Sequence, residues 1–346
     1  MELIALAFPA AKASNTMDDL MDDQPESQDL TLTPVTFTPP SISRTALLAG
    51  ESYTHHSDVP SHLLSTPCVL GIDEAGRGPV LGPMVYGLYY LPTTLHHSLL
   101  AETHRFDDSK VLTPAVRADL FEKICTPGTD LYEQSGWAVR VMSARDIGAA
   151  MLSANGGGNL NTQAMDATIQ LMRDVLEKGV IVKEVFIDTI GPPATYQKKL
   201  EKLFPTLEIT VAKKADSLYP CVSAASVCAK VTRDIALEVL YEPYNSSSTV
   251  TGWGSGYPSD VRCTDWMKGA LDPVFGWGSE CRFSWGTVKE MLEVKGKAKE
   301  AVRVDWPEDE DDGGNMRLTS FMRNEEEEPR DELGHWFGCR VGTEVF

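Results

Sequence analysis

Long apolar runs are missing from this sequence of 346 residues, because no stretch approaches the roughly 18 consecutive apolar residues of a membrane-spanning helix. A secretory signal is missing too. The chain starts with an apolar segment, but Glu2 stands where a signal peptide carries basic residues. We therefore expect a protein that does not act at a membrane and is not secreted.

Cysteine is scarce and irregularly spaced. The seven cysteines are odd in number and form no C-x-x-C pair, so they predict neither a disulfide framework nor a structural zinc site. Such a set of cysteines is typical of a reducing compartment, the cytosol or the nucleus.

Basic residues are outnumbered, and the formal net charge of −19 is unusual for a protein that binds nucleic acid. The acidic excess is concentrated at the two ends. Residues 1–66 carry a net charge of −7 and residues 305–332 one of −9, whereas residues 67–304 carry only −3. A nearly neutral central segment can still hold a local basic groove, so the total charge does not exclude a nucleic-acid substrate.

The composition divides the chain into three segments. Residues 1–66 are rich in Ser, Thr, Pro and Asp without sustained periodicity, which predicts a disordered N-terminal extension. Residues 67–304 have the apolar periodicity of a folded domain. Residues 305–346 predict an acidic, largely disordered tail, and its apolar islands at 318–321 and 336–337 are typical of segments that order on binding a partner.

The central segment alternates strand and helix patterns. Short apolar runs bounded by turn residues predict strands, and apolar residues three and four apart predict helices. We expect strands at about 68–73, 83–91, 137–142, 185–187 and 207–212, and helices at about 114–124, 143–156, 161–178, 194–203, 219–241, 259–270 and 286–303. This alternation predicts an α/β layer fold.

The stretch over residues 71–87 joins two adjacent carboxylates to a glycine-rich corner. Asp73 and Glu74 end an apolar run, and the glycines and Pro79 behind them predict a bend that turns both acids toward one spot. Adjacent charges beside a buried strand are unfavourable without a partner, which indicates a metal-binding corner beside a backbone cradle. A dinucleotide-binding fingerprint is the alternative, but its glycine spacing is off by one and Pro79 interrupts it.

Four acids end or follow short apolar strands, namely Asp73, Glu74, Asp188 and Asp216. Neighbouring strands lie about 4.8 Å apart, so carboxylates at their ends can converge. Oxygen ligands of this kind suit hard divalent cations, and two such ions activate a water molecule and stabilise a leaving oxygen. Taken singly, Asp216 also fits a helix N-cap and Asp188 the start of a turn, and the residue types alone leave these alternatives open.

Several longer motifs occur in a fixed order along the central segment. They are Gly71-Ile-Asp-Glu-Ala-Gly-Arg-Gly-Pro, Asp108-Ser-Lys, Phe186-Ile-Asp-Thr-Ile-Gly and Lys214-Ala-Asp-Ser-Leu-Tyr-Pro-Cys-Val-Ser-Ala-Ala-Ser-Val-Cys-Ala-Lys. This set resembles the type 2 ribonuclease H family. Val80-Leu-Gly-Pro-Met-Val-Tyr, Asp188-Thr-Ile-Gly-Pro-Pro and Gly254-Ser-Gly-Tyr-Pro resemble the eukaryotic catalytic subunits of that family. Several motifs in order are far more specific than one glycine pattern.

The resemblance implies a ribonuclease-H-like fold of the α/β class, with a central mixed β-sheet flanked by helices, a helical C-terminal portion and disordered flanks. It makes residues 67–304 the catalytic domain. It implies hydrolysis of RNA in RNA–DNA hybrids and at single ribonucleotides embedded in duplex DNA. It implies that four acids are catalytic and bind two divalent ions, Mg²⁺ or Mn²⁺. These acids are Asp73, Glu74, Asp188 and Asp216.

The resemblance also assigns substrate contacts. The backbone of Gly76, Arg77 and Gly78 matches the segment that reads the ribose 2′-hydroxyl, the group that separates RNA from DNA. Tyr257 matches the tyrosine that packs on the sugar beside the ribonucleotide. Lys110 and Asn161 match positions that contact phosphates.

We therefore predict a metal-dependent endoribonuclease that cuts on the 5′ side of a ribonucleotide and leaves a 3′-hydroxyl and a 5′-phosphate. The resemblance implies roles in ribonucleotide excision and RNA primer removal, and a heterotrimer with two auxiliary subunits. The expected place of action is the nucleus, with the cytoplasm as a second location. The rival functions are a deoxyribonuclease and a non-catalytic, hybrid-binding scaffold subunit. A sliding-clamp motif at 315–322 matches only in part.

Overall fold

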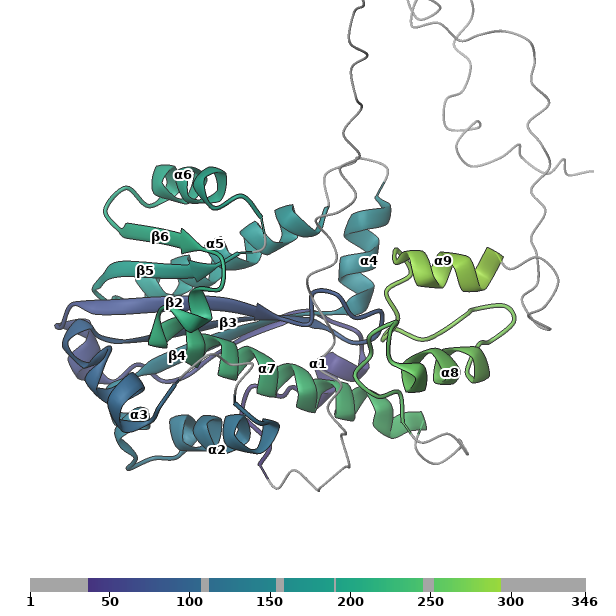
Figure 1. The fold of residues 1–346 in the computed structure, drawn as a ribbon, viewed down its shortest axis with the longest axis horizontal. Coiled ribbons are helices and arrows are strands. Elements are labelled where there is room, and N and C mark those ends of the chain that lie inside the picture. The colour runs from purple at the N-terminus through teal and green to yellow at the C-terminus, as the bar shows by residue number, and fades with distance from the viewer. Residues whose placement is uncertain (1–36, 107–111, 154–158, 190, 245–251, 294–346) are drawn as a thin grey trace, which may run out of the picture. The chain divides into compact units, whose positions relative to one another are not determined.

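The sheet at the centre of the fold is mixed, and it has six strands in the order β1-β4-β3-β2-β5-β6 (Figure 1). The computed structural model describes residues 37–106, 112–153, 159–189, 191–244 and 252–293. The strands are β1 (Tyr53–His56), β2 (Cys68–Ala75), β3 (Met84–Pro92), β4 (Gly136–Met142), β5 (Val182–Asp188) and β6 (Glu208–Ala212). β2 pairs with β3 in antiparallel and with β5 in parallel orientation, so β2 is the strand at which the sheet changes direction.

Helices cover both faces of this sheet, as Figure 1 shows. The α-helices are α1 (Arg44–Leu48), α2 (Pro114–Cys125), α3 (Asp130–Gln134), α4 (Ala144–Leu152), α5 (Leu160–Glu177), α6 (Pro193–Leu203), α7 (Pro220–Tyr241), α8 (Val261–Gly269) and α9 (Gly286–Glu293). α7 packs on the centre of one face with α2 and α1 against it, while α5 and α6 lie on the other. This architecture confirms the α/β class, the mixed sheet flanked by helices and the helical C-terminal portion.

Glycine allows α7 to lie unusually close to the sheet. A Cβ atom on Gly71 would stand 2.3 Å from the carbonyl carbon of Cys221, and one on Gly87 would stand 2.2 Å from the carbonyl oxygen of Ala225. Neither separation is sterically possible, so β2 and β3 need glycine where α7 crosses them. The small residues of α7 complete this close packing, and the helix is almost entirely buried along its length.

The segment before the central domain is partly folded, which corrects the expectation of disorder up to residue 66. Residues 37–66 contain α1, β1 and the 3₁₀ helix η2 (Ser61–Leu64), and β1 pairs with β4 at the edge of the sheet. Leu47 and Leu63 from this segment are buried. The prediction was wrong here because β1 is only four residues long and half-buried throughout, so it has no apolar alternation to reveal it. Residues 1–36 lie outside the described part.

The remaining expected elements are observed with shifted ends. β2 continues to Ala75, two residues beyond the expected end at residue 73, and α9 is described only to Glu293, with residues 294–303 outside the described part. The acidic tail lies outside it as well. Within the described residues, no helix is both long and apolar enough to cross a membrane.

Candidate active site

Two of the predicted acids lie side by side on neighbouring parallel strands. Ile72 of β2 is in register with Ile187 of β5, so Asp73 and Asp188 are the next residues along the two strands. Asp188 is itself in register with Ala212, the last residue of β6, and the chain then passes through a short 3₁₀ turn, η5 (Ala215–Ser217). Asp216 lies in that turn. The parallel pairing thus brings together acids that are more than 100 residues apart in the sequence.

Asp73 is the buried centre of this group, with 5% of its surface exposed. Burial, followed by the negative charges of Asp188 and Glu74, raises the pKa of Asp73 well above its usual range. Asp216 acts in the same direction, and a hydrogen bond from Ser226 of α7 acts against it. The other three acids predicted from the sequence are therefore close enough to act on the carboxyl group of Asp73.

Asp73 and Glu74 do not point the same way, which corrects the expected bend. Both lie inside β2, where successive side chains face opposite sides of the sheet. Asp73 faces α7, whereas Glu74 is near Tyr86 and Tyr196 on the other side and helps burial raise their pKa values, that of Tyr196 to about 12. The chain turns only at Gly76, whose φ of +77° suits glycine.

Backbone hydrogen bonds orient the carboxylates. Oδ1 of Asp188 accepts the Ala215 N–H at 2.6 Å, which ties the end of β5 to the turn that carries Asp216. Oδ1 of Asp73 accepts the Glu74 N–H at 2.8 Å. The turn is entered through Lys214 in the left-handed region, at φ 56°. Asp216 is not the N-cap of α7, because Tyr219 occupies that position.

This donor set has the chemistry of a hard-cation site. Carboxylate oxygens, at two strand ends and a turn, are the ligands that Mg²⁺ and Mn²⁺ prefer. In the described part of the chain, no three His, Cys, Asp or Glu side chains already stand in chelating positions. The carboxylates are therefore gathered but not closed around one point, and their chemistry fits divalent ions.

The glycine corner lies next to Tyr257, although about 180 residues separate them in the sequence. A Cβ atom on Gly78 would stand 3.0 Å from Cε1 of Tyr257, so the ring lies directly against the Gly78 backbone. A Cβ on Gly76 would stand 2.7 Å from the Pro83 carbonyl oxygen. The two features predicted to read the ribonucleotide are thus in contact, and the Gly76 position leaves no room for a side chain.

Arg77 brings a further predicted residue to this corner. Its Nη2 donates a hydrogen bond to Oδ1 of Asn161, near the start of α5. Asn161 therefore lies at the rim of the same site. Lys110, the other predicted phosphate contact, falls outside the described residues.

Arg282 supports the glycine corner through hydrogen bonds to its backbone, and this role was not anticipated from the sequence. This fully buried side chain donates to the carbonyl oxygens of Gly76 (2.6 Å), Arg77 (2.9 Å) and Gly82 (3.0 Å). Trp285 donates its indole N–H to the Gly78 carbonyl at 3.0 Å, and the Arg282 guanidinium lies over the Trp285 ring. Four carbonyls of the corner are thus held by a segment 200 residues away.

Comparison with known proteins identifies the family. The family model described as Ribonuclease HII matches residues 70–288. A ribonuclease H2 subunit of Neurospora crassa is 57% identical over 317 residues, which cover 90% of this chain and 97% of that protein. The human protein of the same name is 42% identical over 290 residues, 83% and 93% of the two chains. The crystal structure of ribonuclease H2 from Pyrococcus horikoshii aligns with a TM-score of 0.53 and 28% identity over 64% of this chain and 96% of that one.

The chain belongs to the ribonuclease HII family. The resemblance stated from the sequence motifs is thereby confirmed, and so is the enzyme class, a ribonuclease H that hydrolyses RNA in hybrids. The family match spans the four acids, the glycine corner, Tyr257 and Arg282 alike.

Sequence reasoning missed the residues of this ribonuclease HII domain that support the site. Arg282, Trp285 and Arg233 carry no local signal, because an arginine inside a helical or loop pattern is usually a surface residue and a lone tryptophan is usually a packing residue. Arg233 of α7 is nevertheless nearly buried, donates to the Ser255 carbonyl and has its guanidinium carbon 5.9 Å from the centre of the Tyr257 ring. Only the fold shows that these residues converge on the glycine corner.

Proposed function

We propose that this chain is the catalytic subunit of a ribonuclease H2 that cuts on the 5′ side of a ribonucleotide, both in RNA–DNA hybrids and at single ribonucleotides in duplex DNA. The products are a 3′-hydroxyl and a 5′-phosphate. The observation that carries this proposal is the gathering of three carboxylates around that of buried Asp73, beside a glycine corner against which Tyr257 packs.

The four acids supply the ligands for two divalent ions, Mg²⁺ or Mn²⁺. When bound, such ions activate a water molecule and stabilise the leaving oxygen. The protein holds the carboxylates for this task, with Asp188 fixed to the turn of Asp216 and Asp73 fixed within β2. Hydrolysis by water, without attack by the 2′-hydroxyl, gives the products named above.

Recognition of the ribonucleotide falls to the glycine corner. The backbone of Gly76, Arg77 and Gly78 approaches the 2′-hydroxyl, the group that distinguishes RNA from DNA. Tyr257 packs on the adjoining sugar. Arg282 and Trp285 keep this backbone in one shape because they hold its carbonyl oxygens, so the corner is preorganised for a ribose. Asn161 and Lys110 contact phosphates.

Assembly and cellular role are part of the same proposal. The relatives are named as subunits, which supports membership of a complex, and we propose a heterotrimer with two auxiliary subunits. The acidic tail at 305–346 serves those partners. The place of action is the nucleus, where the enzyme removes RNA primers and ribonucleotides incorporated into DNA.

Cleavage of three labelled duplexes tests the catalytic proposal: one with a single ribonucleotide, one uniform RNA–DNA hybrid and one all-DNA duplex, each with Mg²⁺ and with the partner subunits present. We expect the first two to be cut and the third to remain intact. Asp73→Asn and Asp188→Asn should nearly abolish cutting, because an amide binds metal weakly and lacks negative charge. Asp119→Asn, on the exposed surface of α2, is the matched control and should cut normally.

The rival functions predict different results. A scaffold subunit would give no cleavage under any condition, and a deoxyribonuclease would cut the all-DNA duplex. Full activity of Asp73→Asn at saturating Mg²⁺ would remove the four acids from the mechanism.

A further inference from the structure

The helix α7 begins without a side-chain cap from its own N-cap residue. Tyr219 is the N-cap residue and makes no capping hydrogen bond, and Pro220 at the first helical position has no N–H. The N–H of Cys221 is therefore one of the unsatisfied donors that every helix start presents. This end of α7 is buried against β2, where water cannot serve as the acceptor.

His96 supplies the missing acceptor from a different part of the chain. It lies beyond the end of β3 with 6% of its surface exposed, and its Nε2 accepts the Cys221 N–H at 3.2 Å. An imidazole nitrogen can accept only when it carries no proton. The contact therefore requires neutral His96.

An aromatic stack fixes the same helix end. The His96 ring stacks on Phe186 of β5 with centroids 5.9 Å apart, and Phe186 stacks on Tyr219 at 4.0 Å. Phe186 lies two residues before Asp188, and Tyr219 lies three residues after Asp216. The stack thus joins the two acid-bearing segments immediately beside their carboxylates.

We propose that His96 is a positioning residue that caps α7 from outside the helix and, with Phe186 and Tyr219, fixes the start of this helix so that Asp216 and Ser226 reach the candidate active site. Asp216 lies in the turn that leads into this helix end, and Ser226, which hydrogen-bonds Asp73, lies five residues beyond Cys221. The link to metal binding rests on the function proposed above, whereas the capping role is independent of it.

A pH dependence of stability follows from the capping role. Burial, followed by the neighbouring His97, lowers the pKa of His96 to about 4, whereas an unfolded histidine titrates near 6.5. Between these values the unfolded chain binds the proton and the folded chain does not, so the contribution of His96 is complete above pH 6.5 and is lost as the pH falls toward 4.

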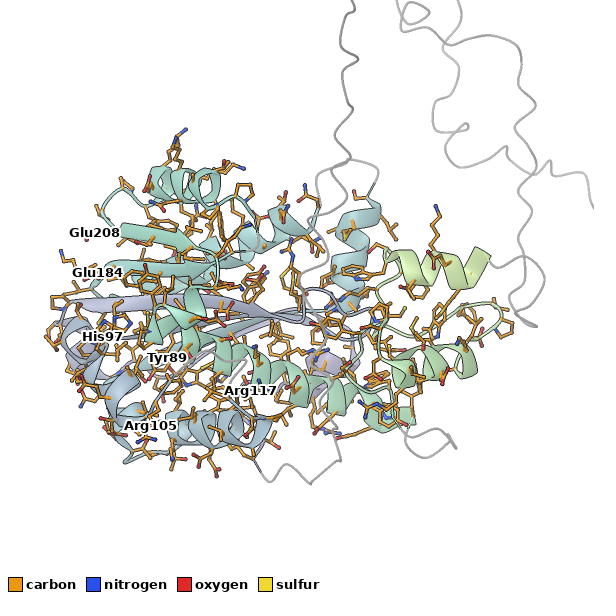
Figure 2. All side chains as sticks on the ribbon, in the orientation of Figure 1. Tyr89, His97, Arg105, Arg117, Glu184 and Glu208 are labelled. Carbon is orange, nitrogen blue, oxygen red and sulfur yellow. The ribbon has the colours of Figure 1, made fainter. Side chains whose placement is uncertain are left out.

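Other titratable groups near this helix end come from three elements. His97 is on the same loop as His96, Glu184 is on β5, and the buried Cys221 thiol is on α7. Figure 2 labels His97 and Glu184, both toward the left end of the sheet in that view. Glu184 and Cys221 are unchanged in every variant below, and His97 is changed only in its own control, so the His96 variants differ from wild type at His96 alone.

Three variants of the full chain in its complex test the proposal. His96→Gln keeps an acceptor that cannot be protonated, His96→Leu removes the acceptor, and His97→Gln changes the exposed neighbouring histidine as a matched control. At pH 7.5, His96→Leu should lower the midpoint of thermal unfolding by roughly 2–10 °C, the effect of leaving one buried backbone donor unpaired. Between pH 7 and 5, wild type and His97→Gln should lose more stability than His96→Gln does.

Metal dependence of cleavage provides the second measurement. His96→Leu should raise the Mg²⁺ concentration for half-maximal cleavage of an RNA–DNA hybrid by roughly 3- to 10-fold, at or below the range seen for direct outer partners of metal ligands. His96→Gln should recover most of this loss, and His97→Gln should match wild type.

Two results would overturn the proposal. If His96→Gln loses stability with falling pH as steeply as wild type, His96 is not the neutral cap. If His96→Leu is less stable but needs no more Mg²⁺, the positioning of the site is refuted. Failure of the proposed function is distinguishable, because wild type would then cleave nothing while the pH difference between the variants persisted.

Discussion

Replacing Arg282 by methionine measures how much its hydrogen bonds stabilise the glycine corner. Methionine keeps an apolar stem but has no donor, so the change leaves the carbonyl oxygens of Gly76, Arg77 and Gly82 without the partner that the fully buried Arg282 side chain supplies. An unpaired buried polar group costs about 1–3 kcal/mol. Three such groups set an upper range of about 3–9 kcal/mol, and removing the burial penalty of the guanidinium charge offsets part of it.

We therefore expect Arg282→Met to lower the free energy of unfolding by about 2–4 kcal/mol, out of the roughly 5–15 kcal/mol typical of a domain. Equilibrium unfolding in urea measures this directly. Arg282→Lys should be intermediate, because lysine keeps the charge and donors but lacks the planar fork that reaches several carbonyls at once. Arg44→Met, which breaks an exposed ion pair with Glu242, serves as the control and should change little.

Cleavage separates support of the corner from general stability. At a temperature where Arg282→Met is still folded, its rate at a single ribonucleotide should fall more than its rate on a uniform hybrid, because the corner that we propose reads the 2′-hydroxyl is no longer held. The reasoning is refuted if Arg282→Met unfolds at the wild-type urea concentration and cuts both substrates normally.

Three further outcomes follow from the structure. Tyr257→Ala should slow cutting at a single ribonucleotide by roughly 5- to 150-fold, and cutting of uniform hybrid less, since a stacked ring contributes about 1–3 kcal/mol; equal losses on both would deny it a role at the junction. Deleting residues 1–36 should leave the unfolding midpoint unchanged, whereas deleting residues 1–60 should lower it, because α1 and β1 are lost; a calorimetric scan in which both deletions match full length would contradict this. Mg²⁺ should raise the unfolding midpoint of wild type but not of Asp73→Asn, and an equal rise in both would place the ions elsewhere.

The local patterns of the sequence predicted most of the sheet and the acids. β2, β3 and β5 are short apolar runs with clear ends, so their carboxylates could be assigned to strand ends before any pairing was known. The pairing of β2 with β5 then brings Asp73 and Asp188 together, a contact that no local pattern specifies. The predicted position of the bend was wrong, because the strand continues through both acids to Ala75.

The support of the site could not be predicted for a different reason. Arg282 and Gly76 are separated by 206 residues, and His96 and Cys221 by 125. Hydrogen bonds over such distances depend on the completed fold, and a single sequence contains no periodicity that encodes them. Residues that carry the chemistry thus stand in motifs, whereas residues that hold them are scattered.

The grouping of the acids is itself an argument for function. The pKa of Asp73 is raised in the folded state, so above the ordinary value of 3.8 the folded chain binds more protons than the unfolded chain. The folded state therefore loses stability as the pH rises from 3.8 through the raised pKa of Asp73. At neutral pH the repulsion among the gathered acids opposes folding. An N-cap or a turn would require no such arrangement, because one carboxylate suffices for either. A divalent cation reverses the sign, since it makes the same negative charges attractive. The folded chain keeps these acids together although they repel each other, and cation binding gives a physical reason for this arrangement.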